Sequence, residues 1–213
     1  MNSIQPLLSI LIPSTPDRRH LLSYLLECIL KQQYLRLVQE FDVGNITAYR
    51  YYDTLATIEI LIMEDKKENS VGVKRQKLLE HAKGVWTAGV DSDDLVADTY
   101  LEDILKALET NPDHVGFLED CDINGEKSLS IFSIKHQQWD ENTDGYDHIR
   151  CANPKSVIRR SIALQVGYED LRFGEDRVFS EAVTPLLKSE IFIDKPLYYY
   201  RHISSPHNER YGI

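Results

Sequence analysis

The chain has 213 residues, so we expect one domain over residues 1–213, large enough to bury a core without disulfides or a structural metal. Its 42% apolar and 27% charged residues are typical of a globular protein, and its net charge of −10 disfavours general nucleic-acid binding. Three widely spaced cysteines do not make a disulfide framework, and no apolar run is long enough to span a bilayer, so we expect a cytoplasmic protein without a transmembrane segment.

The negative charge is concentrated in the middle of the chain. Residues 85–147 carry 16 acidic and 3 basic side chains, whereas the remaining residues carry 18 acidic and 21 basic ones. A cluster of basic side chains follows this stretch: Arg150, Lys155, Arg159 and Arg160. These side chains could steady phosphates or an anionic acceptor, but a solvated basic face is the simpler alternative.

The first half of the chain alternates apolar strands with amphipathic helices. Three apolar runs predict buried strands, each followed by a polar turn and a helix: residues 7–12, 58–63 and 85–90. Thr15 and Pro16 suit the start of the first helix, which we expect to be some twenty residues long. Gly84 suits the end of the second helix as a C-cap, and Asp98 suits the N-cap of the third.

Repeated strand–helix units of this kind are typical of a mostly parallel sheet with helices on both faces. In such sheets the ligand site lies beyond the carboxyl ends of the strands. Pro13, Asp65 and Asp91 stand at the ends of the three predicted strands. We therefore expect these three residues to converge at one edge of the sheet.

The second half of the chain has a less regular pattern. Strands are predicted at residues 115–118, 129–134 and 198–200, and a helix is predicted after Glu175 and Asp176. The polar residues 135–153, which include Trp139, predict a loop over the site. Residues 42–56 are hard to place, and their tyrosines could cover a surface or touch a ligand.

The sharpest feature of the sequence is Asp91-Ser92-Asp93-Asp94. It places three carboxylates directly after a predicted strand, where like charges repel unless a cation lies among them or a proton is retained. Carboxylate oxygens suit Mg²⁺ or Mn²⁺, whose open positions suit a diphosphate. The alternative for an isolated Asp-x-Asp is a helix-entry turn, but the second acidic strand end at Asp65 favours a functional site.

Six segments of the chain carry a family resemblance: Ser9–Thr15, Ile60–Asp65, Gly72–Leu79 with Ala82–Gly84, Asp91–Asp94, Phe173–Asp176 and Pro196–His202. Together, and in this order, they resemble a family 2 glycosyltransferase of the GT-A fold. The resemblance implies a Rossmann-like nucleotide-binding half, about residues 1–95, and an acceptor and catalytic half, about residues 96–213. It also implies an inverting transfer of a sugar from a nucleoside-diphosphate sugar, most commonly a UDP-sugar.

The resemblance implies roles for five residues in donor binding. Asp65 would pair with the nucleobase, and Pro13 and Thr15 would line the nucleoside pocket. Arg75 would lie near the base or the ribose, and Asp91 would contact the ribose. The run after Thr15 departs from the family, which usually has an aromatic residue and Asn there, so the identity of the base is the weakest part of the resemblance.

The resemblance also implies the residues of the reaction centre. Asp93 would bind the Mn²⁺ or Mg²⁺ ion that bridges the diphosphate, and His202 or His207 could add a metal contact. Asp176 would be the general base, with Glu175 positioning the acceptor. A carboxylate suits that task because an acceptor hydroxyl is a poor nucleophile until its proton is removed. The alternative for the acidic pair is a helix N-terminus whose acids complement the helix dipole.

Several functions remain open from the residues alone. The expected acceptor is a saccharide, a lipid-linked molecule or a surface polymer, and the chain could act as a homodimer. One alternative is a non-catalytic module that binds a sugar nucleotide or a carbohydrate on the same scaffold. Another is a nucleotidyltransferase, but the first strand is not followed by a glycine-rich phosphate loop. Transfer to modified DNA bases is disfavoured by the acidic middle of the chain.

Overall fold

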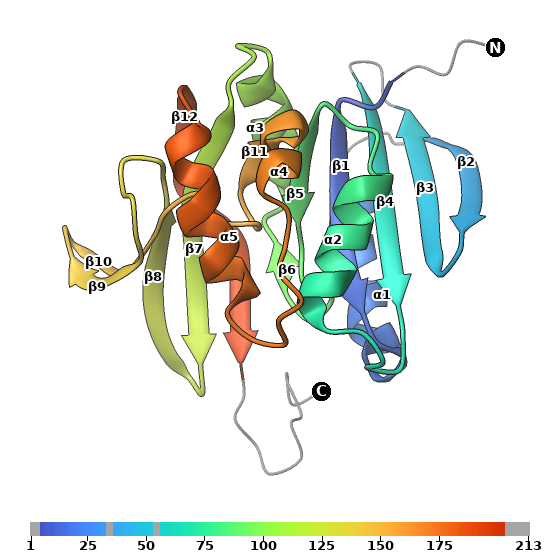
Figure 1. Cartoon of the computed structure of the whole chain (residues 1–213), viewed down its shortest axis with the longest axis horizontal. Coiled ribbons are helices and arrows are strands. Elements are labelled where there is room, and N and C mark those ends of the chain that lie inside the picture. The colour runs from blue at the N-terminus through green and yellow to red at the C-terminus, as the bar shows by residue number, and fades with distance from the viewer. Residues whose placement is uncertain (1–4, 33–35, 53–55, 203–213) are drawn as a thin grey trace.

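The computed structural model describes residues 5–32, 36–52 and 56–202 of the chain. In these residues twelve strands form a single sheet with helices on both faces (Figure 1). The strands follow the order β2-β3-β4-β1-β5-β11-β7-β8-β10-β9, while β12 pairs with β7 and with the short β6. The α/β fold class that the sequence predicts is confirmed, and the sheet contains both parallel and antiparallel pairs.

Three parallel strands form the centre of the first half. β1 (Leu8–Ser14) lies between β4 (Thr57–Glu64) and β5 (Trp86–Gly89) and runs parallel to both. All seven residues of β1 are buried, because helices cover both faces of the sheet here. A strand buried on both faces has a continuous apolar sequence, which is why these three strands are predictable from the sequence.

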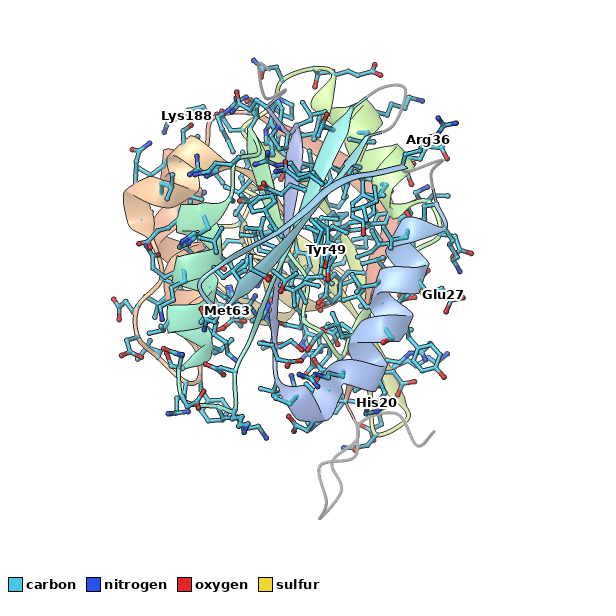
Figure 2. The ribbon with its side chains drawn as sticks, turned by 90° about the vertical axis from the view of Figure 1, so that its right-hand side faces the viewer. His20, Glu27, Arg36, Tyr49, Met63 and Lys188 are labelled. Carbon is cyan, nitrogen blue, oxygen red and sulfur yellow. The ribbon has the colours of Figure 1, made fainter. Side chains whose placement is uncertain are left out.

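Helices pack on both faces of this parallel core. One face is covered by two helices: α1 (Arg19–Leu30) and α3 (Tyr100–Leu108). The other face is covered by three helices: α2 (Val71–His81), α4 (Arg160–Val166) and α5 (Glu175–Val183). Figure 2 looks onto the edge of the sheet, with α1, which carries His20 and Glu27, on one side and α2 on the other. Within the described ranges, no helix is both long and apolar enough to cross a membrane.

One short strand joins the two halves of the sheet. β11 (Val157–Arg159) is antiparallel to β5 on one side and to β7 (His114–Ile123) on the other, so β5 and β7 run in the same direction. β12 (Glu190–His202) is parallel to β7, and the arrowheads of both lie at the bottom of Figure 1. The carboxyl ends of β5, β7 and β12 therefore meet at one edge of the sheet.

The remaining elements of the second half are β6 (Leu95–Val96), β8 (Glu126–Phe132), β9 (Asp140–Thr143), β10 (Tyr146–Arg150) and the 3-10 turn η2 (Thr184–Leu186). β8 is antiparallel to β7, and β10 pairs with β8 and with β9. The predicted loop over residues 135–153 is therefore wrong in part, because it contains the hairpin β9–β10.

The structure also places the region that the sequence leaves unassigned. Residues 42–52 belong to a hairpin of β2 (Arg36–Val43) and β3 (Ile46–Tyr52), and β3 pairs antiparallel with β4. Tyr49 and Tyr51 stack at 6.5 Å between ring centroids. This hairpin extends the sheet at the edge farthest from β9, and Figure 2 shows Tyr49 near the middle of that edge.

Three predicted helix boundaries are wrong. The first helix, α1, has only 12 residues and follows a 3-10 turn, η1 (Pro16–Arg18). α3 begins after Thr99 rather than Asp98, whose carboxylate instead lies 3.1 Å from the Lys31 ammonium. α2 ends at His81 with Ala82 as its C-cap, so Gly84 has another role: a Cβ there would lie 2.6 Å from the backbone nitrogen of Ser9 in β1.

Candidate active site

A cavity of about 480 Å³ opens at the edge of the sheet where β5 and β7 end. Its walls include the turn after β5, the start of α5 and one face of β7, β8 and β10. Its size and its place beyond the carboxyl ends of parallel strands are typical of a ligand site. Five residues of the predicted site line it together: Arg75, Asp91, Asp93, Glu175 and Asp176.

The acidic motif forms a tight turn at the end of β5. The Asp94 backbone N–H donates to the Asp91 carbonyl oxygen at 3.0 Å, which brings the three carboxylates of the turn close together. Each of them has a basic partner: Asp91 lies 2.7 Å from Arg75, Asp93 lies 3.2 Å from Arg18, and Asp94 lies 3.9 Å from Lys155. The like-charge repulsion expected from the sequence is therefore offset by three cations from outside the motif.

Arg75 joins the acidic turn to the acidic pair on α5. Its Nη2 donates to Asp91 at 2.7 Å, and its Nε donates to Glu175 at 3.1 Å. Burial alone would lower the pKa of Arg75, but the charges of Asp91 and Glu175 outweigh that effect and raise it. The guanidinium therefore stays charged and fixes two walls of the cavity relative to each other.

The two acids of α5 have different environments. α5 starts directly after Gly174, whose backbone φ of 77° favours glycine. Both acids therefore lie in the first turn of the helix. Glu175 is buried and held by Arg75, and burial raises the pKa of its carboxyl although Arg75 works against that rise. Asp176 is partly exposed, and its Oδ1 accepts from the Arg177 backbone N–H at 2.8 Å. Asp176 is thus the more accessible of the two carboxylates.

Asp94 has a structural part in the site. The Tyr198 hydroxyl of β12 donates to Asp94 Oδ2 at 2.8 Å and accepts from the Asp91 backbone N–H at 3.0 Å. Burial raises the pKa of the Asp94 carboxyl, although the Lys155 charge opposes that rise. The last described strand therefore holds the acidic turn in place.

The opposite wall of the cavity is built on β7, β8 and β10. Glu119 on β7 lies 2.6 Å from the Lys155 ammonium, which also lies 4.4 Å from the centroid of the Tyr200 ring. The Arg150 guanidinium stacks on Trp139 at 4.3 Å. The Trp139 indole N–H is buried and has no hydrogen-bond acceptor among the residues that the structure describes. This wall combines aromatic surface with charged side chains.

Three residues predicted to bind the nucleoside do not line the cavity: Pro13, Thr15 and Asp65. All three are buried at the ends of β1 and β4. The Asp65 carboxylate accepts from Asn69 and from the Lys67 backbone, and Lys74 reaches it at 3.1 Å. Burial alone would raise the pKa of Asp65, but these contacts outweigh it and lower the pKa. Contact of Asp65 with a base stays a prediction, and the structure gives Asp65 a role in ordering its own loop.

The two predicted histidine ligands do not add to the acidic turn in the described residues. His202 ends β12 and stacks on Tyr200 at 6.5 Å, and it does not line the cavity; His207 lies outside the described residues. In the ranges that the structure covers, no three His, Cys, Asp or Glu side chains are grouped to hold a metal by themselves. Asp91 and Asp93 nevertheless suit an ion of the Mg²⁺ type, which proteins commonly bind through one or two carboxylates and the phosphates of a substrate.

Sequence reasoning did not single out two residues of the cavity. Arg18 lies in the run where the sequence departs from the family pattern, and Glu119 lies just after a predicted strand. The number of charged residues identifies neither of them, because each forms an ion pair with a residue that is distant in the chain. A carboxylate at the end of the strand 115–118, which would run parallel to the others, was the available signal for Glu119.

Comparison with solved structures supports the fold assignment. The structure superposes on a fragment of S. aureus TarS in complex with UDP-GlcNAc with a TM-score of 0.61 and 14% sequence identity, over 93% of this chain and 59% of that chain. The mannosyltransferase PcManGT from Pyrobaculum calidifontis, in complex with GDP-Man and Mn²⁺, gives a TM-score of 0.51 and 14% identity, over 92% of this chain and 57% of that one. The fold is GT-A-like.

The likeness is one of structure. No protein-family model matches the chain, and no curated protein sequence matches it. The chain spans about 60% of the length of the TarS fragment, so these solved proteins contain segments for which this chain has no counterpart. At identities of 13–15% the comparison establishes the fold, and the function must be argued from the site itself.

Proposed function

We propose that the chain is an inverting glycosyltransferase that moves a sugar from a nucleoside-diphosphate sugar to an acceptor hydroxyl. One observation carries this proposal: Asp176 lines the same cavity as Asp91 and Asp93, although it lies in a distant part of the chain. The solved neighbours add support, because their complexes contain UDP-GlcNAc, UDP or GDP-Man with Mn²⁺. In this proposal residues 1–213 form one domain with a donor half, about residues 1–95, and an acceptor half.

The donor would bind with its diphosphate facing the acidic turn. Mn²⁺ or Mg²⁺ bound by Asp93, with Asp91 beside it, would stabilise the negative charge that develops on the leaving diphosphate. Arg75 holds Asp91 at 2.7 Å and keeps its carboxylate at the cavity wall. The base of the donor is expected to be uracil, although the neighbour with GDP-Man makes guanine the first alternative to measure.

Asp176 would remove the proton of the acceptor hydroxyl. As the proton moves to the Asp176 carboxylate, the acceptor oxygen forms a bond to the anomeric carbon and the bond from that carbon to the diphosphate oxygen breaks. A single displacement from the opposite face inverts the configuration of that carbon, as in inverting glycosidases. Glu175 is the poorer candidate because it is buried and already bonded to Arg75, so we assign it a positioning role.

Two aromatic side chains, one on each wall of the cavity, suit a sugar ring in the acceptor. Trp139 lines the cavity, and Phe173, which precedes the acidic pair, lines the cavity with 91% of its surface exposed. An exposed aromatic ring beside polar groups is suited to the apolar face of a sugar and to its hydroxyls. We therefore favour a saccharide acceptor, either free or as part of a lipid-linked molecule or a surface polymer.

The proposal is tested with donor binding and donor turnover measured separately. Wild-type protein and the variants Asp93→Ala and Asp176→Asn are titrated with UDP-sugars and GDP-Man, with and without Mn²⁺, to measure donor binding. Turnover is measured as nucleotide release during slow hydrolysis of the donor, in which water replaces the acceptor. Asp93→Ala should lose Mn²⁺-dependent binding. Asp176→Asn should keep it and lose turnover by roughly 10²-fold or more.

The exposed Asp194 on β12, which does not line the cavity, provides a matched control. Asp194→Asn should match the wild type in both measurements. Full turnover by the Asp176→Asn variant would show that Asp176 is not the base. Donor binding without turnover in the wild type would favour a non-catalytic binding module. Proton NMR of the released sugar gives the configuration, and retention of configuration would contradict the single displacement.

A further inference from the structure

Two of the three cations around the acidic turn are held firmly. The Arg75 side chain is 8% exposed and contacts both Asp91 and Glu175, and the Lys155 side chain is 12% exposed and contacts Glu119 as well as Asp94. Removing either cation would leave two carboxylates in a buried setting without their charge partner. Breaking a buried ion pair lowers the stability of the folded protein strongly, so Arg75 and Lys155 are fixed parts of the cavity wall.

Arg18 is held much less firmly. Its side chain is 38% exposed, whereas that of Asp93 is fully buried, and the two lie 3.2 Å apart. Arg18 is the last residue of the short turn η1, and the N-cap of that turn makes no side-chain hydrogen bond. A long, partly hydrated side chain on a short turn is free to move, so it can leave the buried Asp93 when another cation takes its place there.

The position of Arg18 is that of the expected divalent cation. Its guanidinium contacts Asp93, the residue of the motif that would bind the metal, and it lines the same cavity as Asp91 and Asp176. Asp93 is buried, so a cation near it is needed to offset its charge whether or not a donor is bound. The guanidinium also has the planar set of donors that binds phosphate oxygens in pairs.

We propose that Arg18 is an exchangeable counter-ion of the acidic turn. Before the donor binds, Arg18 neutralises Asp93; when a divalent ion takes its place at Asp93, Arg18 turns to the diphosphate of the donor. This inference rests on the proposed function, because it requires a nucleoside diphosphate and a divalent ion in the cavity. It makes Arg18 a donor-positioning residue supplied by the run in which the sequence departs from the family pattern.

The proposal predicts opposite effects on two affinities. In Arg18→Gln, a neutral variant of similar length, Mn²⁺ alone should bind about twofold to fivefold more tightly, because its competitor at Asp93 is gone. UDP at saturating Mn²⁺ should bind roughly tenfold to a hundredfold more weakly, because the diphosphate loses charged hydrogen bonds. Arg18→Lys keeps the charge but loses the paired donors, so it should leave the Mn²⁺ affinity at the wild-type value and weaken UDP binding.

The neighbouring Arg19 is a matched control, because it pairs with Glu64 at 2.6 Å and does not line the cavity. Arg19→Gln should change neither affinity by more than about twofold. The measurements are calorimetric titrations with Mn²⁺, and with UDP and GDP in the presence of Mn²⁺, on variants whose thermal unfolding shows that they are folded. Unchanged or weaker Mn²⁺ binding by folded Arg18→Gln overturns the proposal, and so does unchanged UDP binding.

The same titrations distinguish this proposal from the proposed function. If the wild type binds neither UDP nor GDP in the presence of Mn²⁺, the proposed function fails and the role of Arg18 fails with it. If the wild type binds a nucleotide with Mn²⁺ but Arg18→Gln behaves like Arg19→Gln, only the role of Arg18 fails. If both affinities of Arg18→Gln fall together, Arg18 merely supports the shape of the cavity, and the exchange is contradicted.

Discussion

The two walls of the cavity hold their polar groups in different ways. On the wall formed by the turn after β5 and the start of α5, Asp91 and Glu175 share the buried guanidinium of Arg75. The wall formed by β7, β8 and β10 also contains a buried ion pair, between Lys155 and Glu119, but around Trp139 its contacts are looser: Arg150 stacks on Trp139, and His148 pairs with the exposed Glu141. The first wall fixes charges where the proposed reaction develops charge, whereas the part of the second wall around Trp139 can adapt to an acceptor. The two walls should therefore respond differently to substitution.

The largest effect is expected at Arg75. Arg75→Leu leaves the carboxylates of Asp91 and Glu175 without their cation, and breaking a buried ion pair in this way costs about 3–5 kcal/mol of the free energy of unfolding. Urea denaturation measures this loss. The double variant Arg75→Leu/Glu175→Leu should recover part of it, because one stranded carboxylate is gone. A loss below about 1 kcal/mol in the single variant would show that the first wall is as adaptable as the second.

An intermediate effect is expected at Tyr198, which belongs to the first wall through its hydroxyl. Tyr198→Phe removes the donor to Asp94 and the acceptor for the Asp91 backbone N–H, both in a buried setting, and should cost about 1–3 kcal/mol of stability. The adjacent Tyr199 points to the other face of β12, and Tyr199→Phe should cost less than about 0.5 kcal/mol. Equal losses of stability in the two variants would contradict the hydrogen-bond role assigned to the Tyr198 hydroxyl.

The smallest effect on stability is expected at Trp139, on the second wall. Trp139→Ala should change the free energy of unfolding by about 1 kcal/mol or less, because this side chain is partly exposed. It should lower transfer to a saccharide acceptor by roughly threefold to tenfold while donor hydrolysis is unchanged, since only the acceptor would stack on the ring. Trp139→Phe should restore most of the transfer. Parallel losses of transfer and hydrolysis in Trp139→Ala would place Trp139 in donor binding instead.

The sequence predicts the first half of the molecule better than the second for a physical reason. β1, β4 and β5 are covered by helices on both faces, so their apolar runs and the polar turns after them are local signals. The helices on both faces follow from those signals, whereas the order of the strands was not predicted, and the convergence of Asp91 and Asp93 with the acidic pair on α5 follows from the family resemblance. The family resemblance supplied the acidic pair itself.

The second half was harder to predict because its signals are not local. The face of β7 that lines the cavity carries Glu119 and Cys121, so its pattern lacks the apolar alternation expected of a core strand. The hairpin β9–β10 has polar strand sequences without an apolar pattern, and the Asp144-Gly145 pair, both of whose φ values are positive, was the available signal for its turn. The pairings of Arg18 with Asp93 and of Lys155 with Glu119 join distant segments, which no pattern along the chain reveals.

The contact of Tyr198 with the acidic turn has a consequence for the order in which the molecule is assembled. The turn after β5 receives its two Tyr198 hydrogen bonds from β12, although more than a hundred residues separate the turn from Tyr198 along the chain. The strands of the first half can already associate while the chain is still being synthesised. Asp91 and Asp94, however, lack the hydrogen bonds to Tyr198 until β12 has paired with β7. A nascent chain would therefore complete its fold and the acidic turn of its cavity in the same late step.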